Sequence, residues 1–189
     1  MAWLEIDDSW NGDERSRGGP IRLMHHDARW RQEFEQTRSS ILLCCDGRVS
    51  AVHHIGGTAL PGLIARPVID LVATVDAGDD LDVVQACIEG LNYRVVDGPD
   101  WAANPITLEK PRHGETTHRV MLTLPNSTCR QQAAAIRDHF RQNREAAMSF
   151  EQWKVECWRD TQGDPAEYDR VKSAYFDQLQ QELKRTSRD

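Results

Sequence analysis

The feature that most constrains this chain is the stretch HHIGGTALPGLIARPVIDLV at residues 53–72, in which two apolar runs flank a glycine turn. Residues 49–55 predict a strand that ends at the glycines. Residues 67–75 form a strongly β-branched run, which is typical of a central strand. Gly56 and Gly57 interrupt the chain between the two runs. The sequence therefore predicts a strand–turn–strand unit in the first half of the chain.

Helix-like and strand-like patterns lie on both sides of this unit. Asp27 can cap a helix that ends at Asp46-Gly47. The apolar face of this helix, at helical spacing, consists of Trp30, Phe34, Thr37 and Ile41. The other predicted elements are a short strand at 21–24, a short helix or a loop at 60–64, a helix from 81 to 90, a strand at 93–96, and an antiparallel pair at 106–109 and 117–124.

After Ser127 the pattern becomes helical, with three successive segments. The last segment carries an apolar stripe that consists of Tyr168, Val171, Tyr175, Leu179 and Leu183. We interpret this stripe as a packing surface. Its end could also contact a second copy of the chain in a homodimer. This order predicts an α+β fold with helices packed on a sheet. We divide the chain into a polar leader at 1–20, which includes Trp3 and Trp10, an α+β core at 21–126 and a helical C-terminal part at 127–189.

Composition excludes several classes of function. The formal net charge of −7 over 189 residues argues against general nucleic-acid binding, which requires a basic face. No run approaches the about 20 apolar residues of a membrane span, and the N-terminus lacks the pattern of a secretory signal. The five cysteines show no C-x-x-C spacing. We therefore expect reduced thiols in a cytoplasmic protein.

The chemistry of the central unit suits a phosphate and a metal. The backbone at Gly56 and Gly57 can approach a ligand closely, and Thr58 can add a hydroxyl. Arg66 can clamp a phosphate, and Asp70 can bind Mg²⁺. Together these groups predict triphosphate binding and phosphoryl or nucleotidyl transfer. The alternative is a plain tight turn with a buried Asp70 that backbone amides satisfy.

Other residues are candidates to complete such a site. His54 beside the glycine turn and His118 on a later strand can contact a phosphate; a hydrogen-bonded structural role is the stronger alternative for His54 and an equal one for His118. Lys154 and Lys172 come from helices that could close over the cleft, and their charges would attract a triphosphate. Further candidates with a surface or packing role as the alternative are His53, Trp101, Arg137 and Arg141.

The central motif resembles the GrpB family, a bacterial family placed in the nucleotidyltransferase superfamily. The family pattern H-I-G-S-T-[SA]-V-P-G-L-x-A-K-P-I-I-D-I is similar to H-I-G-G-T-A-L-P-G-L-I-A-R-P-V-I-D-L, which starts at His54. The resemblance extends to W-x-x-x-F at Trp30 and to RDHFRQNREAAMSFEQWK at 137–154. It also includes Tyr168, Lys172 and Phe176, and therefore covers about 21–180.

This resemblance implies a nucleotidyltransferase-like mixed sheet flanked by helices. In that superfamily the glycine turn begins a helix that receives the nucleotide phosphates, and an acidic pair D-h-[DE] on the next strand holds two metals. Asp70 matches the first acid, as a catalytic and metal-binding residue, with 12 residues between it and Gly57. The second acid falls at Val72, where the family commonly departs as well. Glu109 or Glu115 would have to replace it.

Two functions follow from these observations. The first is a nucleotide- or phosphoester-binding protein with weak, Mg²⁺-dependent nucleotidyl transfer. The second is a catalytically inactive module that binds a nucleotide, a coenzyme or a partner protein. Some family members are fused to dephospho-coenzyme A kinase, which implies a link to coenzyme A metabolism. The apolar Val72 favours the inactive module, because two-metal catalysis needs several carboxylates.

Overall fold

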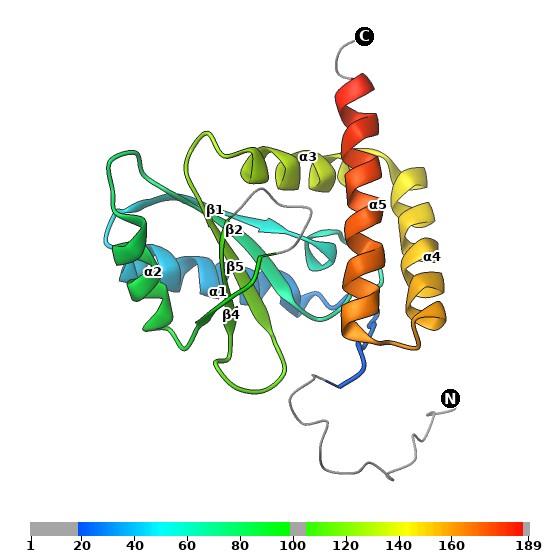
Figure 1. The fold of residues 1–189 in the computed structure, drawn as a ribbon, viewed down its shortest axis with the longest axis horizontal. Coiled ribbons are helices and arrows are strands. Elements are labelled where there is room, and N and C mark those ends of the chain that lie inside the picture. Colours follow the sequence, from blue (N-terminus) through cyan, green and yellow to red (C-terminus); the bar gives the residue numbers. More distant parts are fainter. Residues whose placement is uncertain (1–18, 99–104, 187–189) are drawn as a thin grey trace.

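The fold is a five-stranded sheet with helices on both faces, seen in a computed structural model that describes residues 19–98 and 105–186 (Figure 1). The α+β class with a mixed sheet, predicted from the sequence, is confirmed. The elements in chain order are α1 (Arg29–Cys44), β1 (Val49–Ile55), η1 (Gly57–Ala59), β2 (Ile69–Val75), α2 (Leu81–Glu89), β3 (Arg94–Val96), β4 (Ile106–Lys110), β5 (His118–Thr123), α3 (Thr128–Gln142), α4 (Arg144–Asp160) and α5 (Pro165–Thr186).

The sheet has the strand order β1-β2-β5-β4-β3, so the strand that carries Asp70 lies inside it. β1 pairs antiparallel with β2, and β2 pairs parallel with β5. In this register Asp70 lies opposite Ile55 on one side and Arg119 on the other. The predicted strand–turn–strand unit and the predicted antiparallel pair β4–β5 are both confirmed.

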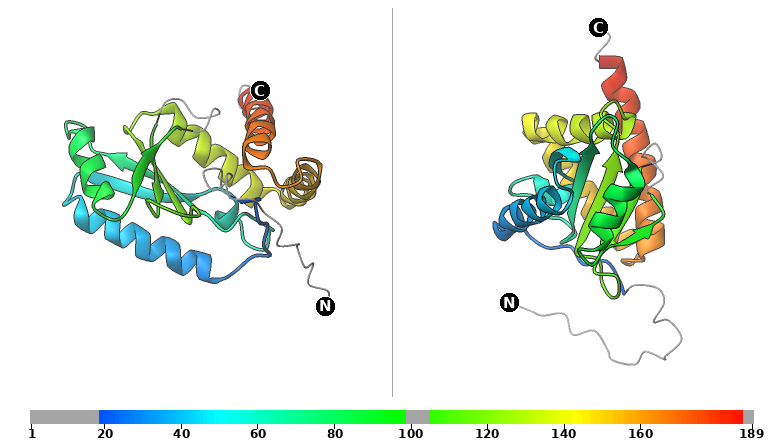
Figure 2. Two further views of the ribbon diagram at one scale, coloured as in Figure 1. Left: turned by 60° about the horizontal axis from the view of Figure 1, so that its bottom comes forward. Right: turned by 90° about the vertical axis from the view of Figure 1, so that its left-hand side faces the viewer.

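Side chains alternate between the two faces of the sheet, as strand geometry requires. On β2, Leu71 belongs to a core shared with α1 and α2, whereas Val72 packs with Cys129 and Ala133 of α3. Figure 2 shows α1 on one side of the sheet and α3 on the other, with α4 and α5 at one end. Asp70, two residues before Val72, therefore faces the side of α3.

The helical C-terminal segments complete the molecule at the end of the sheet where the glycine turn lies. Phe140, Phe150 and Phe176 come from α3, α4 and α5 and form one core cluster with Leu60 and Leu63 from the loop after the turn. All three helices predicted after Ser127 are present. The boundary drawn between residues 126 and 127 stays a prediction, and α3 packs directly on the sheet.

Two local predictions need correction. The predicted strand at 21–24 makes only a bridge between Met24 and Ala65, because its start bonds elsewhere: the Ile21 amide donates to the Gly163 carbonyl. The helix implied to start at the glycines is a single 3-10 turn, Gly57–Ala59, and residues 60–64 form a loop. Gly62, at φ +83°, has a backbone conformation that no helix contains.

Some predictions lie outside the described residues, namely Trp3 and Trp10 of the leader and Trp101. All five cysteines are free thiols. Among residues 19–98 and 105–186, no helix has both the length and the apolar character that crossing a bilayer requires.

Candidate functional site

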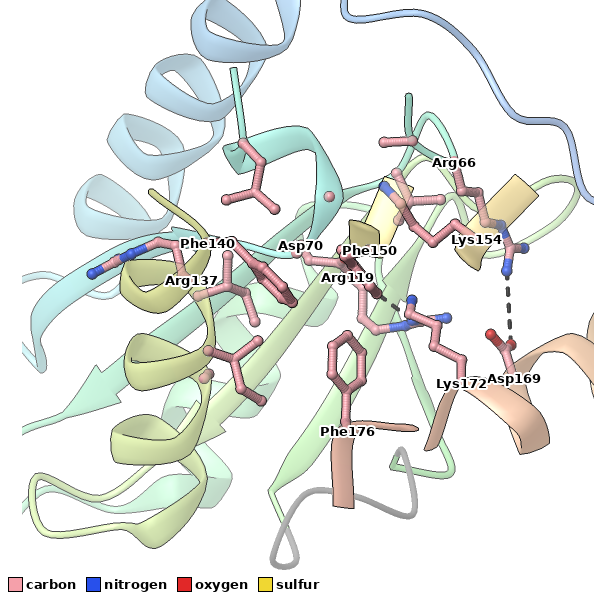
Figure 3. A pocket seen from close by; sticks show the side chains of 18 of the residues that line it. Arg66, Asp70, Arg119, Arg137, Phe140, Phe150, Lys154, Asp169, Lys172 and Phe176 are labelled. Carbon is pink, nitrogen blue, oxygen red and sulfur yellow. Dashed lines mark ion pairs between the residues drawn. The ribbon is translucent and has the colours of Figure 1, made fainter. Parts of the chain in front are cut away.

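A pocket of about 90 Å³ lies where the glycine turn, the sheet and the three C-terminal helices meet. Figure 3 shows the side chains that converge on it. Its lining in the described part of the chain includes five basic residues, Arg66, Arg119, Arg137, Lys154 and Lys172, and two acidic ones, Asp70 and Asp169. The sequence predicted Gly56, Gly57, Arg66, Asp70, Lys154 and Lys172 as site residues, and the fold brings these six together.

The glycine turn is closely packed against the acid of the next strand. Gly56 has φ +73°, and a Cβ atom at this position would clash with Oδ2 of Asp70. A Cβ atom on Gly57 would lie 2.9 Å from the Cβ of Ala65. Both positions therefore need glycine, the first for backbone conformation and contact and the second for contact alone. The absence of a side chain at Gly56 allows the Asp70 carboxylate to lie directly beside the turn.

Arg119 of β5 joins two acids at the floor of the pocket. Its Nη2 and Nε donate to Oε1 of Glu109 at 2.6 and 2.9 Å, and its Nη1 lies 3.7 Å from Oδ1 of Asp70. Burial raises the pKa of Asp70, although the positive charges of Arg119, Lys172 and Arg66 oppose this. The Glu109 carboxylate has stronger hydrogen-bond partners than Asp70. Burial would raise the pKa of Glu109, but the charge and hydrogen bonds of Arg119 and a hydrogen bond from Thr116 lower it overall.

Two more basic side chains reach the pocket from different elements. Arg66 comes from the loop before β2 and lies 3.8 Å from Asp169 of α5, an ion pair drawn in Figure 3. Lys172, one turn further along α5, has its pKa lowered by burial, while the charges of Asp70 and Asp169 oppose the shift. Arg66 and Lys172 therefore bring positive charge to the same cavity from two distant parts of the chain.

The remaining walls are apolar. Phe140 and Phe150 stack with ring centroids 4.5 Å apart, and Phe176 lies 5.7 Å from Phe150. All three rings line the pocket and are buried. An apolar wall excludes water and strengthens the electrostatic interactions inside the cavity.

The donor set does not fit a two-metal centre. Val72, at the position of the second acid, is 1% exposed and lies beneath α3. Glu109 is held by Arg119, and Glu115 is exposed and absent from the pocket lining. No group of three or more His, Cys, Asp or Glu side chains in the described residues could hold a metal ion. Mg²⁺ prefers several oxygen ligands, whereas Asp70 has cations as its neighbours.

Three residues expected to bind phosphate have other partners. His54 faces α1, where its ring stacks on Phe34, and its Nε2 lies 3.0 Å from Oγ1 of Thr58. The Thr58 hydroxyl donates to the Val68 carbonyl, so Thr58 accepts from His54 and joins β1, the turn and β2. His118 also lies on the side of α1, in a separate cavity of about 310 Å³ with Glu33 and Lys110. None of the three lines the main pocket.

The two candidate arginines on α3 mainly form hydrogen bonds that link α3 to the region of the glycine turn. Arg137 donates to the His54 carbonyl and pairs with Asp138, and its side chain extends away from the other cations in Figure 3. Arg141 donates to the Ala59 carbonyl. Both side chains therefore fix α3 to the region of the glycine turn.

Sequence reasoning missed Arg119 and Asp169. Arg119 immediately follows His118, so strand alternation places it on the face opposite His118 and on the same face as its parallel neighbour Asp70. To infer from the sequence that Arg119 lies beside Asp70, one must know that β2 pairs with β5, and the sequence alone did not predict this pairing. Asp169 had no local signal, because its role depends on the position of α5 against the loop of Arg66.

Comparison with known proteins identifies relatives whose names assign no activity. Relatives include the UPF0157 protein BH1888 of Halalkalibacterium halodurans, 28% identical over 51% of this chain and 50% of its own, and UPF0157 protein PA4798 of Pseudomonas aeruginosa, 31% identical over 52% of this chain and 37% of its own. These matches span half or less of the relatives' lengths. The glutamate-rich protein GrpB of Alkalihalophilus pseudofirmus is 21% identical over 87% of this chain and 97% of its own.

The fold is shared with a solved structure. The crystal structure of conserved protein GrpB from Enterococcus faecalis superimposes with a TM-score of 0.76 at 21% identity, covering 89% of this chain and 100% of that one. The family model described as GrpB protein matches residues 20–182, which include every element of the fold up to the last turn of α5. The chain therefore belongs to the GrpB family.

Proposed function

We propose that this protein binds the phosphoryl group of a nucleotide or another phosphorylated small molecule in the pocket beside the glycine turn. The observation that carries the proposal is the charge of the pocket, where Arg66, Arg119, Lys154 and Lys172 gather with two acidic side chains around one small cavity, while Arg137 pairs with Asp138. The chain as a whole is acidic, with a net charge of −7, so this concentration of positive charge is local. A cleft of one sign focuses the field on an ion of the opposite sign.

Three cations suit direct contact with the anion. Arg66 comes from the loop before β2 and Lys172 from α5, and Arg119 of β5 lies beside Asp70. A phosphate would satisfy Lys172 and the free donors of Arg66 with charge-assisted hydrogen bonds. Gly56 and Gly57 carry no side chain of their own, so their backbone packs closely against Asp70 and Ala65 at the edge of the cavity, next to the amine of Lys154.

The size of the cavity limits what enters it. Its volume of about 90 Å³ is well below the about 300–1,000 Å³ of sites that enclose whole small molecules. A phosphoryl group with a few carbon atoms fits this space. The base and sugar of a nucleotide would have to remain outside the cavity or displace its walls.

Binding is the function we propose, rather than nucleotidyl transfer. The transfer reaction in the superfamily relies on two metals, and Asp70 is the only carboxylate of the expected pair. The phosphate-binding proposal needs no metal, because protein cations supply the neutralising charge. Any link to coenzyme A metabolism stays an expectation from the family resemblance.

The test is a calorimetric titration of inorganic phosphate and of adenosine triphosphate into the full chain and into Arg66→Ala. A hydrogen bond to a charged group contributes about 1.5–3 kcal/mol, so the dissociation constant should rise roughly tenfold or more. Arg31→Ala, at an exposed position on α1, is the matched control and should bind like the parent. Equal affinities in the parent and Arg66→Ala would exclude Arg66 as a phosphate ligand.

A further inference from the structure

Lys154 is a buried lysine in the wall of the pocket. Its side chain is 3% exposed and belongs to α4. Its Nζ donates to the Ile64 carbonyl, lies 4.8 Å from the centroid of the Phe150 ring, and would be 3.8 Å from a Cβ atom on Gly57. The amine is therefore next to the glycine turn, on the inner surface of the cavity.

No carboxylate neutralises this amine. Among the ion pairs of the described residues, none includes Lys154. The nearby Glu151 accepts a hydrogen bond from the Ile64 amide, and the other charged neighbour is Lys172. Burial and the charge of Lys172 lower the pKa of Lys154 to about 8, and Glu151 only partly opposes this. Near neutral pH a larger fraction of this amine is therefore neutral than in an ordinary lysine, whose pKa is about 10.4.

A neutral amine is a nucleophile toward carbonyl groups. It can keep one N–H bond to the Ile64 carbonyl while its lone pair stays available. We propose that Lys154 forms an imine with a small phosphorylated aldehyde or ketone whose phosphoryl group is held by the cations of the same pocket. This inference rests on the proposed function, since the phosphate site supplies the selectivity for a phosphorylated carbonyl compound.

The chemistry balances without any oxidant or further reactant. The lone pair on Nζ forms a bond to the carbonyl carbon, and the π pair of the carbonyl moves to its oxygen. One proton passes from nitrogen to that oxygen through water, which gives a carbinolamine. Loss of the hydroxyl group as water, with the second proton of the nitrogen, leaves the imine. The buried rings of Phe140, Phe150 and Phe176 limit the access of water that would hydrolyse it.

The test uses glycolaldehyde phosphate, the smallest phosphorylated aldehyde, on the full chain at pH 7.5 with cyanoborohydride to trap the imine. The chain has four lysines, Lys110, Lys154, Lys172 and Lys184, so peptide mapping can follow each one. Lys184 is exposed and serves as the internal reference. Lys154 should be modified at least about tenfold faster than Lys184, because the bound phosphate holds the aldehyde beside it. Added inorganic phosphate should remove this preference.

Matched controls separate this inference from the proposed function. Unphosphorylated glycolaldehyde should show a much smaller preference for Lys154. Lys154→Met, which retains the approximate length of the side chain, should lose the rapid modification at position 154, while Lys184 should be modified at the same rate as in the parent. Should this variant fail to fold, the modification map of the parent decides alone.

Two results would overturn the inference. They differ in whether they also exclude the proposed phosphate binding. If calorimetry shows phosphate binding but Lys154 reacts no faster than Lys184, the reactive amine is excluded and the phosphate site stands. If Lys154 reacts fast with both aldehydes and phosphate gives no protection, a phosphorylated substrate is excluded together with the proposed function.

Discussion

His54 shows how a residue expected to bind a ligand can instead stabilise the fold. Burial, with the positive charges of Arg141 and Arg137, lowers its pKa to about 4 from 6.5. Because the Thr58 hydroxyl gives its proton to the Val68 carbonyl, His54 is the donor in their hydrogen bond and needs only its neutral form. Its ring also stacks on Phe34 at a centroid distance of 4.7 Å.

The lowered pKa of His54 predicts a pH dependence. The neutral form dominates in the folded state, so its contribution is complete above pH 6.5 and is lost as pH falls toward about 4. This shift corresponds to about 3 kcal/mol. In His54→Gln the free energy of unfolding, measured with urea, should be lower at pH 7 but should fall less steeply between pH 6.5 and 4. The exposed His25→Gln is the control. Equal slopes in His54→Gln and the parent would contradict this account.

The elements β1, η1 and β2 show why some of the site could be predicted from the sequence. Alternation along β2 puts Asp70 and residue 72 on one face, and the structure agrees, because Asp70 lines a pocket with Ala133 of α3, which also packs on Val72. The turn glycines followed from their position between two strands. These are local patterns, which depend on neighbours along the chain.

The parts that could not be predicted depend on packing between distant elements. The family resemblance predicts a helix after the glycines. Instead, Leu60 and Leu63 pack in the core formed by α3, α4 and α5, and Gly62 has a positive φ that is incompatible with a right-handed helix. Arg119 joined the site through the pairing of β2 with β5. The buried, unpaired state of Lys154 likewise depends on how α4 packs against the loop at Ile64.

A substitution on β2 tests whether residue 72 belongs to a metal site. Val72 is 1% exposed among Met121, Cys129 and Ala133. Arg130 and Arg137 border a cavity that Val72 also lines, but a carboxylate there would still leave water for a largely apolar site, so Val72→Asp should lose about 1–3 kcal/mol of unfolding free energy. Val72→Asn, of similar shape and without charge, is the matched control. Thermal unfolding should show no stabilisation of either variant by Mn²⁺ with a triphosphate. Selective rescue of Val72→Asp would indicate a metal clamp in this cleft.

At the scale of the whole molecule, the pocket exists only because the two halves of the chain meet. Gly56, Arg66, Asp70 and Arg119 come from the sheet and its loops, whereas Lys154 and Lys172 come from α4 and α5. The ion pair between Arg66 and Asp169 joins these halves at the pocket. The helical part therefore contributes to ligand binding in this account, in addition to packing.

The central claim is that protein cations, and not a metal on Asp70, bind the phosphate. The most direct measurement is calorimetric titration of inorganic phosphate into the full chain, once in EDTA and once in excess Mg²⁺. The account predicts binding in both conditions with the same dissociation constant, since Arg66, Arg119 and Lys172 are present in either. Binding that occurs only with Mg²⁺, or in neither condition, would contradict it.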